Sequence, residues 1–309
     1  MKLVQFRLRR EEKAVPRTGA LIAGGKAILD LASTLDGHGK GGWLPAHTSC
    51  EWYNVDGSVW SLVRSACEVA LSADDKTVAQ WMKQGRVVAL EDARLTAPVP
   101  RPGKLICIGL NYRDHALEQG VPVPESPIVF SKFTTAIVGP EDQVVVPPAC
   151  KEPDYEAELA VVIGRTAKNV SRETAYQHVF GYCAFNDISG RDFQFADKQW
   201  QRGKSCDTFA PMGPFVATRE EIKDPHGLGI KLRLNGEVMQ NSRTDQLIFK
   251  VPELIEFLSA SVTLEPGDII ATGTPPGVGF ARKPPVYLKS GDRMEVEIDG
   301  LGVLVNSVR

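Results

Sequence analysis

The chain has 309 residues, of which 43% are hydrophobic and 24% are charged, close to the averages of globular proteins. This composition excludes a fibrous, low-complexity or broadly disordered protein, and the length suffices for about two domains. The 36 basic and 38 acidic side chains give a formal charge of −2, so no overall positive field exists to attract nucleic acid or anionic lipid. We therefore expect neither nucleic-acid nor membrane partners.

The sequence shows no membrane span, no signal peptide and no pattern of paired cysteines. No apolar run reaches the roughly 18 residues that a membrane span requires, and residues 1–6 lack the apolar core of a signal peptide. The six cysteines are scattered without a CxxC pair, which predicts reduced thiols rather than a zinc site or a disulfide framework. We expect a soluble protein of an intracellular compartment.

The first hundred residues are predicted to form a small α+β unit. Strands are expected over residues 3–8 and near residues 20–31, with a helix after them. One face of that helix would carry apolar side chains at helical spacing, namely Val59, Leu62, Val63, Ala66, Val69 and Ala70. This face is expected to pack on the two strands.

A domain boundary is predicted at residues 97–103. This segment contains three prolines, which cannot join a helix or a central sheet ladder, so it is typical of a semi-rigid connector. We expect a small N-terminal α+β domain over residues 1–98 and a larger catalytic domain over residues 99–309.

Strand patterns dominate the larger domain. Asn235 and Gly236 stand between two strand-like runs, which predicts a hairpin, and residues 251–261 predict one helix. The irregular spacing of the strands excludes repeated βαβ units. The fold class is therefore α+β, mostly β. Strands are expected over residues 104–110, 128–132, 143–146, 156–164, 181–186, 230–239, 268–272 and 294–298.

Two carboxylates in one strand are the sharpest chemical signal. Glu156 and Glu158 are two residues apart, so they project from the same face of a strand. Residues 160–163 are apolar on both faces, as in a strand that is covered on both sides. Buried carboxylates repel each other and lose hydration unless a cation neutralises them, so a bound metal ion explains the pattern better than a solvent-facing strand.

A third ligand is available where the next apolar strand meets a polar turn. Asp187 is the first candidate and Asp192 is its rival, although an aspartate in this place is often only a turn residue. A site made only of oxygen ligands favours a hard cation, Mg²⁺ first and then Mn²⁺ or Ca²⁺.

His115 and Glu118 form a second candidate pair. They are three residues apart and would share one face of a helical turn. A carboxylate beside an imidazole fixes its tautomer and raises its basicity, which suits a general base with its orienting partner. The alternative is a pair on a helix surface with no chemical role.

Lys204 lies in a Gly-Lys-Ser sequence that invites comparison with a phosphate-binding loop. The first glycine of that motif would fall at Lys198, so the motif fails. Lys204 is then either a solvated charge or a cation aimed at a substrate carboxylate. Residues 272–279 follow a strand and could offer hydroxyl and backbone N–H groups to an anion, or form only a structural turn.

Together these segments resemble the fumarylacetoacetate hydrolase superfamily from about Arg101 to the C-terminus. The resemblance lies in an E-x-E sequence followed by D-x-x-x-R-D, in N-Y-x-x-H-x-x-E, in G-K-S and in T-G-T-P. It implies metal ligands at Glu156, Glu158 and Asp187, and catalytic roles for His115, Glu118 and Lys204. It also implies substrate contacts from Tyr112, Arg191, Gln194 and Thr274.

Further segments are similar to the branch of this family called fumarylacetoacetate hydrolase domain-containing protein 2. They lie at residues 1–6, 121–124, 128–133, 137–140 and 282–286. The resemblance implies a mixed β-sandwich roll, a homodimer, and Mg²⁺ or Mn²⁺ as cofactor. It implies the mitochondrial matrix if the organism is eukaryotic and a presequence has been removed, and otherwise the cytoplasm.

The expected activity is a Mg²⁺-dependent reaction of small 2-oxo acids through a metal-stabilised enolate. Oxaloacetate keto–enol tautomerisation is the first hypothesis. Lys204 and Thr274 would hold the distal carboxylate while His115 moves a proton at C3. The alternatives are hydrolysis of a carbon–carbon bond in acylpyruvates, oxaloacetate decarboxylation, and a non-catalytic protein that binds 2-oxo acids through a metal ion.

Overall fold

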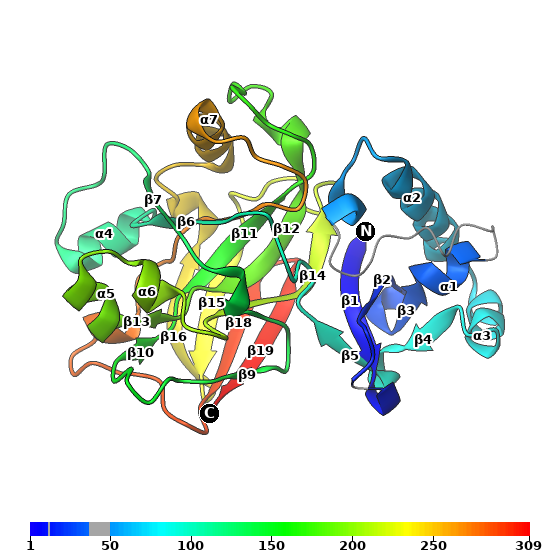
Figure 1. Cartoon of the computed structure of the whole chain (residues 1–309), viewed down its shortest axis with the longest axis horizontal. Coiled ribbons are helices and arrows are strands. Elements are labelled where there is room, and N and C mark those ends of the chain that lie inside the picture. Colours follow the sequence, from blue (N-terminus) through cyan, green and yellow to red (C-terminus); the bar gives the residue numbers. More distant parts are fainter. Residues whose placement is uncertain (12, 37–49) are drawn as a thin grey trace.

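The computed structural model describes residues 1–11, 13–36 and 50–309, without the side chain of Cys50. Figure 1 shows the N-terminal elements gathered at one end of the molecule and helices α4 (Arg113–Gln119), α5 (Arg191–Asp197) and α6 (Gln201–Lys204) at the other. Within the described ranges, no helix is long and apolar enough to cross a membrane. The five cysteines whose side chains are described are unpaired, as predicted, and Cys50 falls outside them.

The N-terminal unit contains more strands than the sequence patterns predicted. The strand expected near residues 20–31 is two strands, because Gly24 and Gly25 have φ angles of 65° and 86° and turn the chain back. The first strand is found where it was expected. The elements of this unit are β1 (Lys2–Leu8), β2 (Arg17–Ile22), β3 (Ala27–Asp30), β4 (Val87–Ala89), β5 (Ala93–Thr96), α1 (Leu31–Asp36), α2 (Ser58–Leu71) and α3 (Asp75–Lys83).

Helix α2 is present, but its buried face is rotated from the predicted one. The buried side chains are Trp60, Val63, Cys67 and Ala70, whereas Val69 is 60% exposed. The Trp60 ring packs edge-on against Phe180 with ring centroids 4.8 Å apart. This large aromatic contact decides the orientation of the helix, and apolar spacing alone did not reveal it.

One large sheet runs through both parts of the chain. Strand β1 pairs with β14, so the sheet continues past the proline-rich segment at residues 97–103, and the boundary at residue 98 stays a prediction. In the described residues the main path follows the order β4-β3-β2-β1-β14-β12-β11-β17-β6-β7. Its further strands are β6 (Leu105–Gly109), β7 (Ile128–Ser131), β8 (Ile137–Val138), β11 (Ala157–Ile163), β12 (Val179–Asn186), β14 (Ala210–Thr218) and β17 (Ile269–Ala271).

A smaller five-stranded sheet lies against the large one. It contains the predicted hairpin, in which Asn235 and Gly236 have φ angles of 53° and 86° and join β15 to β16. The strand expected over residues 230–239 is therefore this hairpin. Its strands are β9 (Gln143–Val144), β15 (Gly229–Leu234), β16 (Glu237–Arg243), β18 (Arg293–Ile298) and β19 (Gly302–Val308), and β10 (Pro153–Asp154) pairs with β13 (Ser189–Gly190) elsewhere.

Strand β11 is covered on both faces, as its apolar sequence predicted. Leu159 and Val161 belong to the core that includes Leu232 and Val296 of the smaller sheet. Ala160 and Val162 belong to a second core with residues of the N-terminal unit. The architecture is therefore α+β and mostly β, and the glutamates that precede Ala160 are directed into a closed region.

Helix α7 (Val251–Ser261) has the predicted bounds, and a histidine stabilises its N-terminus. The Val251 N–H donates to His226 Nε2 over 3.1 Å, which requires the neutral imidazole. Burial lowers the pKa of His226 below its usual value. A histidine whose pKa is lower in the folded protein stabilises the fold at pH values above its unfolded pKa of about 6.5. This stabilisation is lost as the pH falls through the lower pKa of the folded protein.

We expect the thermal unfolding midpoint of the protein to fall between pH 7 and pH 5, and to fall less in His226→Gln. The amide oxygen of glutamine can accept from the Val251 N–H without gaining a proton in this range. Differential scanning calorimetry at several pH values would measure the effect. An identical pH dependence in the two proteins would contradict the role of His226.

Candidate metal and substrate site

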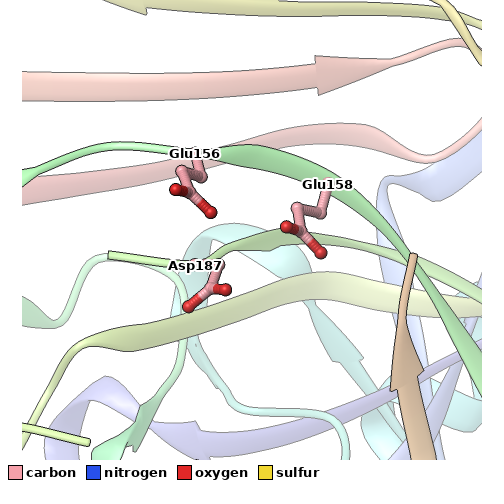
Figure 2. Close-up of side chains that lie close together, drawn as sticks. All are labelled: Glu156, Glu158 and Asp187. Atoms are coloured by element: carbon pink, nitrogen blue, oxygen red, sulfur yellow. The ribbon is translucent and has the colours of Figure 1, made fainter. Parts of the chain in front are cut away.

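Three buried carboxylates form the centre of the site. Glu156, Glu158 and Asp187 each offer an oxygen within 4.8 Å of the other two, and all three residues are buried. Figure 2 shows the two glutamates projecting from the same side of the β11 segment towards Asp187. The structure therefore brings together the three residues that were predicted to bind a metal ion.

The pairing of β11 with β12 creates this cluster. Ala157 is opposite Asn186, so the residues just outside this pair, Glu156 and Asp187, also face each other across the antiparallel ladder. The Asp187 N–H donates to the Glu156 carbonyl oxygen over 2.8 Å. Glu158 lies one pleat further along the same face. Spacing in one strand and register between two strands thus produce the triad.

The rival aspartate has another function. Asp192 accepts a hydrogen bond from the Lys151 N–H over 2.8 Å and contacts Cys150 Sγ at 3.5 Å. It therefore holds a neighbouring loop and is not part of the carboxylate cluster. Of the two candidates, Asp187 is the one that joins the carboxylate cluster, in agreement with the ligand set that the family resemblance implied.

Two buried lysines partly neutralise the triad. Lys204 Nζ lies 2.7 Å from Glu156 and 2.8 Å from Asp187, and Lys132 Nζ lies 2.5 Å from the other oxygen of Asp187. Burial alone would lower the pKa of Lys204, but attraction by Asp187 and Glu156 raises it, so Lys204 is an ammonium ion. Lys204 is thus buried against the metal ligands, and it is not a solvated surface charge.

Among the described residues, Glu158 forms no ion pair of this kind. Its Oε2 accepts a hydrogen bond from the Gly273 N–H over 2.9 Å. Desolvation, together with repulsion from Asp187 and Glu156, raises the pKa of Glu158 well above its ordinary value. A divalent cation would remove this unfavourable charge arrangement, and the all-oxygen donor set fits a hard ion such as Mg²⁺, Mn²⁺ or Ca²⁺. The residues present therefore fit the metal that the sequence predicted.

Arg191 connects the triad to Gln194. Its Nη2 atom lies 2.7 Å from Glu156 Oε1 and 2.9 Å from Asp154 Oδ2. Its Nη1 atom donates to Gln194 Oε1 over 2.9 Å. Asp154 in turn accepts from the N–H groups of the segment that carries Phe280. The side-chain oxygen of Gln194 accepts this hydrogen bond, so its two N–H donors remain available for other partners.

The predicted His115–Glu118 pair is present on α4. His115 Nδ1 lies 3.0 Å from Glu118 Oε2, and the other oxygen of Glu118 accepts from the Gly277 N–H over 2.9 Å. A carboxylate at Nδ1 places the ring proton there, so Nε2 of the neutral imidazole carries the lone pair. The Gln119 amide nitrogen lies 2.7 Å from this Nε2 and can donate to it.

We expect Gln119→Met to lower kcat by about two- to tenfold, the value of one hydrogen bond, because the His115 ring then loses its second contact. Metal affinity should not change. Steady-state kinetics with Mn²⁺ titrations would measure both quantities. The control is Leu117→Ala on the exposed side of the same helix. A wild-type kcat in Gln119→Met would show that Glu118 alone positions the ring.

One cavity of about 220 Å³ joins these groups. Of the predicted residues, those that line it are His115, Glu156, Glu158, Arg191, Gln194, Lys204 and Thr274. Thr274 Oγ1 donates to the Ala157 carbonyl oxygen over 3.0 Å and accepts from Gln240 over 2.8 Å. Tyr112 is buried in the core and is not among the described residues that line the cavity, so its substrate contact stays a prediction.

Lys132, Gln119 and Asp154 were not predicted as site residues. Lys132 directly follows an apolar strand, and Asp154 lies two residues before Glu156 of the E-x-E sequence, so both positions carried a weak local signal. Their partners, Asp187 and Arg191, are more than thirty residues away in the sequence. No local spacing rule connects residues over such distances.

Comparison with known proteins agrees with this geometry. A family model described as the C-terminal part of fumarylacetoacetate (FAA) hydrolase matches residues 104–309. The chain belongs to the fumarylacetoacetate hydrolase family. Oxaloacetate tautomerase FAHD2A, mitochondrial, of Bos taurus is 44% identical to this member over 100% of the chain and 91% of the relative. Fumarylacetoacetate hydrolase domain-containing protein 2 homolog of Dictyostelium discoideum is 50% identical over 72% of the chain and 77% of the relative.

Solved structures share the fold of this fumarylacetoacetate hydrolase family member. Fumarylacetoacetate hydrolase from Exiguobacterium antarcticum superposes with a TM-score of 0.79 at 34% identity, covering 100% of this chain and 99% of that one. The 5-carboxymethyl-2-hydroxymuconate delta-isomerase from Mycobacterium smegmatis gives a TM-score of 0.72 at 32% identity, covering 100% and 98%. The family and the mixed β-rich α+β fold that the sequence predicted are therefore confirmed.

Proposed function

We propose that this protein is a divalent-metal-dependent keto–enol tautomerase of small 2-oxo acids, with oxaloacetate as a substrate. The observation that carries the proposal is that His115, which pairs with Glu118, lines the same small cavity as Glu156 and Glu158 of the buried carboxylate triad. Relatives named oxaloacetate tautomerases, at 43% and 44% identity over the whole chain, support the same activity.

His115 is the group that moves the proton. Glu118 holds Nδ1–H, so Nε2, once the substrate hydroxyl takes the place of the Gln119 amide, can accept a proton from the enol hydroxyl and return one to C3 of the substrate. The imidazolium formed between these steps is stabilised by the adjacent Glu118 carboxylate. No bond between heavy atoms breaks in this reaction, so the pair needs no activated water.

Glu156, Glu158 and Asp187 would hold the cation, which when bound supplies Lewis-acid stabilisation for negative charge that develops on a substrate oxygen. Lys204 and Lys132 keep the anionic charge of these ligands in balance. Gln194, held by Arg191, directs its amide N–H groups to a substrate oxygen. Thr274, fixed by Gln240, forms a further polar contact in the cavity.

The test is the ultraviolet decay of freshly dissolved enol-oxaloacetate, with and without protein and with Mg²⁺ or Mn²⁺, while pyruvate is assayed in the same sample. Metal-dependent acceleration of enol loss without extra pyruvate is the expected result. Extra pyruvate would identify a decarboxylase. Faster turnover of an acylpyruvate than of oxaloacetate would identify a hydrolase, and metal-dependent binding of a 2-oxo acid without any turnover would identify a binding protein.

Compartment and assembly are parts of the same proposal. Relatives from Bos taurus and Xenopus laevis are named mitochondrial, which supports the mitochondrial matrix as the compartment if this chain is eukaryotic. We also propose a homodimer, which is usual in the family. Light scattering coupled to size-exclusion chromatography would give twice the mass of 33.7 kDa for a dimer.

A further inference from the structure

The wall of the cavity is more apolar than a dicarboxylate substrate requires. Besides the carboxylates, His115 and their polar neighbours, the lining includes apolar side chains from β6 and β7, from the segment of α5 and α6, from the residue Val121 after α4 and from the segment of Phe280. Six of these side chains are Ile108, Val121, Ile128, Phe130, Trp200 and Phe280. The cavity thus offers polar groups to the reacting atoms and apolar side chains to another part of the substrate.

Trp200 has a fixed place in this wall. Its ring packs edge-on against Phe130 with centroids 5.3 Å apart. It also lies so close to Gly109 that a Cβ atom at that position would be 2.4 Å from the indole ring. Glycine at position 109 therefore lets the indole lie against the backbone of β6. The wall is built by specific packing, as expected of a surface that selects a substrate group.

The cations of the cavity are already paired. Among the described residues that line it, the basic side chains other than His115 are Lys204 and Arg191. Lys204 contacts Glu156 and Asp187, and Arg191 contacts Glu156 and Asp154. The first carboxylate of a 2-oxo acid is bonded to the reacting carbonyl, so it stays with the polar groups that bind this carbonyl. No unpaired cation of the described lining remains for a second carboxylate, such as the distal one of oxaloacetate.

We infer that the cavity accepts monocarboxylic 2-oxo acids that carry an apolar group on C3, such as an aryl group, and that Trp200 selects this group. The inference rests on the proposed tautomerase function. The enol hydroxyl transfers its proton to His115, and the electron pair of the O–H bond forms the C2=O double bond. The electron pair of the C2=C3 double bond then forms a C–H bond between C3 and the proton that His115 returns. The apolar group stays unchanged and is buried against Trp200 and its neighbours, which favours its binding.

The experiment compares kcat/KM for the ketonisation of freshly dissolved enol-phenylpyruvate and enol-oxaloacetate with Mn²⁺ present. The wild-type protein should accelerate both reactions. In Trp200→Ala the ratio of kcat/KM for phenylpyruvate to that for oxaloacetate should fall by about tenfold or more. In Ile128→Lys the ratio should also fall, because a free cation is placed at a position that is 39% exposed. Phe257→Ala, an exposed aromatic outside the cavity, is the control and should keep the ratio.

The outcomes separate the inference from the function on which it rests. Turnover of oxaloacetate without turnover of phenylpyruvate would overturn the inference and leave the proposed function intact. An unchanged ratio in both Trp200→Ala and Ile128→Lys, with thermal unfolding showing that each variant is folded, would also overturn it. Turnover of neither substrate would overturn the proposed tautomerase itself.

Discussion

Glu158→Gln is expected to lose metal binding and activity together, and yet to be more heat-stable than the wild-type protein without metal. In the described part of the chain Glu158 forms no ion pair, and desolvation and repulsion by its neighbours raise its pKa. Removing this carboxylate therefore relieves repulsion in the metal-free state. The same change removes one anionic oxygen ligand, so the affinity for Mn²⁺ should fall by about a hundredfold or more, or about 3 kcal/mol.

Two measurements on the same protein samples test this expectation. Isothermal titration calorimetry gives the Mn²⁺ affinity, and thermal unfolding with and without Mn²⁺ gives the stability. Mn²⁺ should raise the unfolding midpoint of the wild-type protein and have little effect on Glu158→Gln. Asp192→Asn is the matched control, because Asp192 binds a loop amide and should not affect Mn²⁺ affinity. Wild-type affinity in Glu158→Gln would exclude Glu158 as a ligand.

His115→Ala is expected to lower kcat by about 10²- to 10⁴-fold, the usual contribution of a positioned acid–base group. His115 is the imidazole that lines the cavity in the described structure, and Glu118 fixes its tautomer. Mn²⁺ affinity should be unchanged, because the proposed ligands lie in or directly beside β11 and β12 and not on α4. Removal of the proton-transfer group thus separates catalysis from metal binding.

Glu118→Gln provides the intermediate case. Glutamine can still accept from His115 Nδ1–H, but it has no charge to stabilise the imidazolium, so we expect a smaller loss of about tenfold. His178→Gln is the matched histidine control, because the His178 ring contacts the Thr166 carbonyl oxygen and does not line the cavity. Enol-oxaloacetate decay under conditions limited by chemistry would measure all three variants. Full activity in His115→Ala would show that another group moves the proton.

The positions of Glu156 and Glu158 on one face, and of His115 and Glu118 on one helical turn, were predictable from sequence. The alternation of a strand and the period of a helix set these directions locally, whatever the rest of the fold. The hairpin at Asn235 and the helix over residues 251–261 were predictable for the same reason. The strand over residues 210–218 was missed because it contains Pro211 and Pro214, which argue against a strand.

Tertiary structure alone decided which distant groups meet. It brought Asp187 and not Asp192 into the carboxylate cluster, buried Lys132 and Lys204 against the triad, and packed Tyr112 in the core. It also gathered the apolar wall from separate segments. These outcomes depend on strand register and on packing between residues far apart in the chain, which local periodicity does not encode. The sequence by itself determined the chemical groups and their directions, and the folded chain determined their partners.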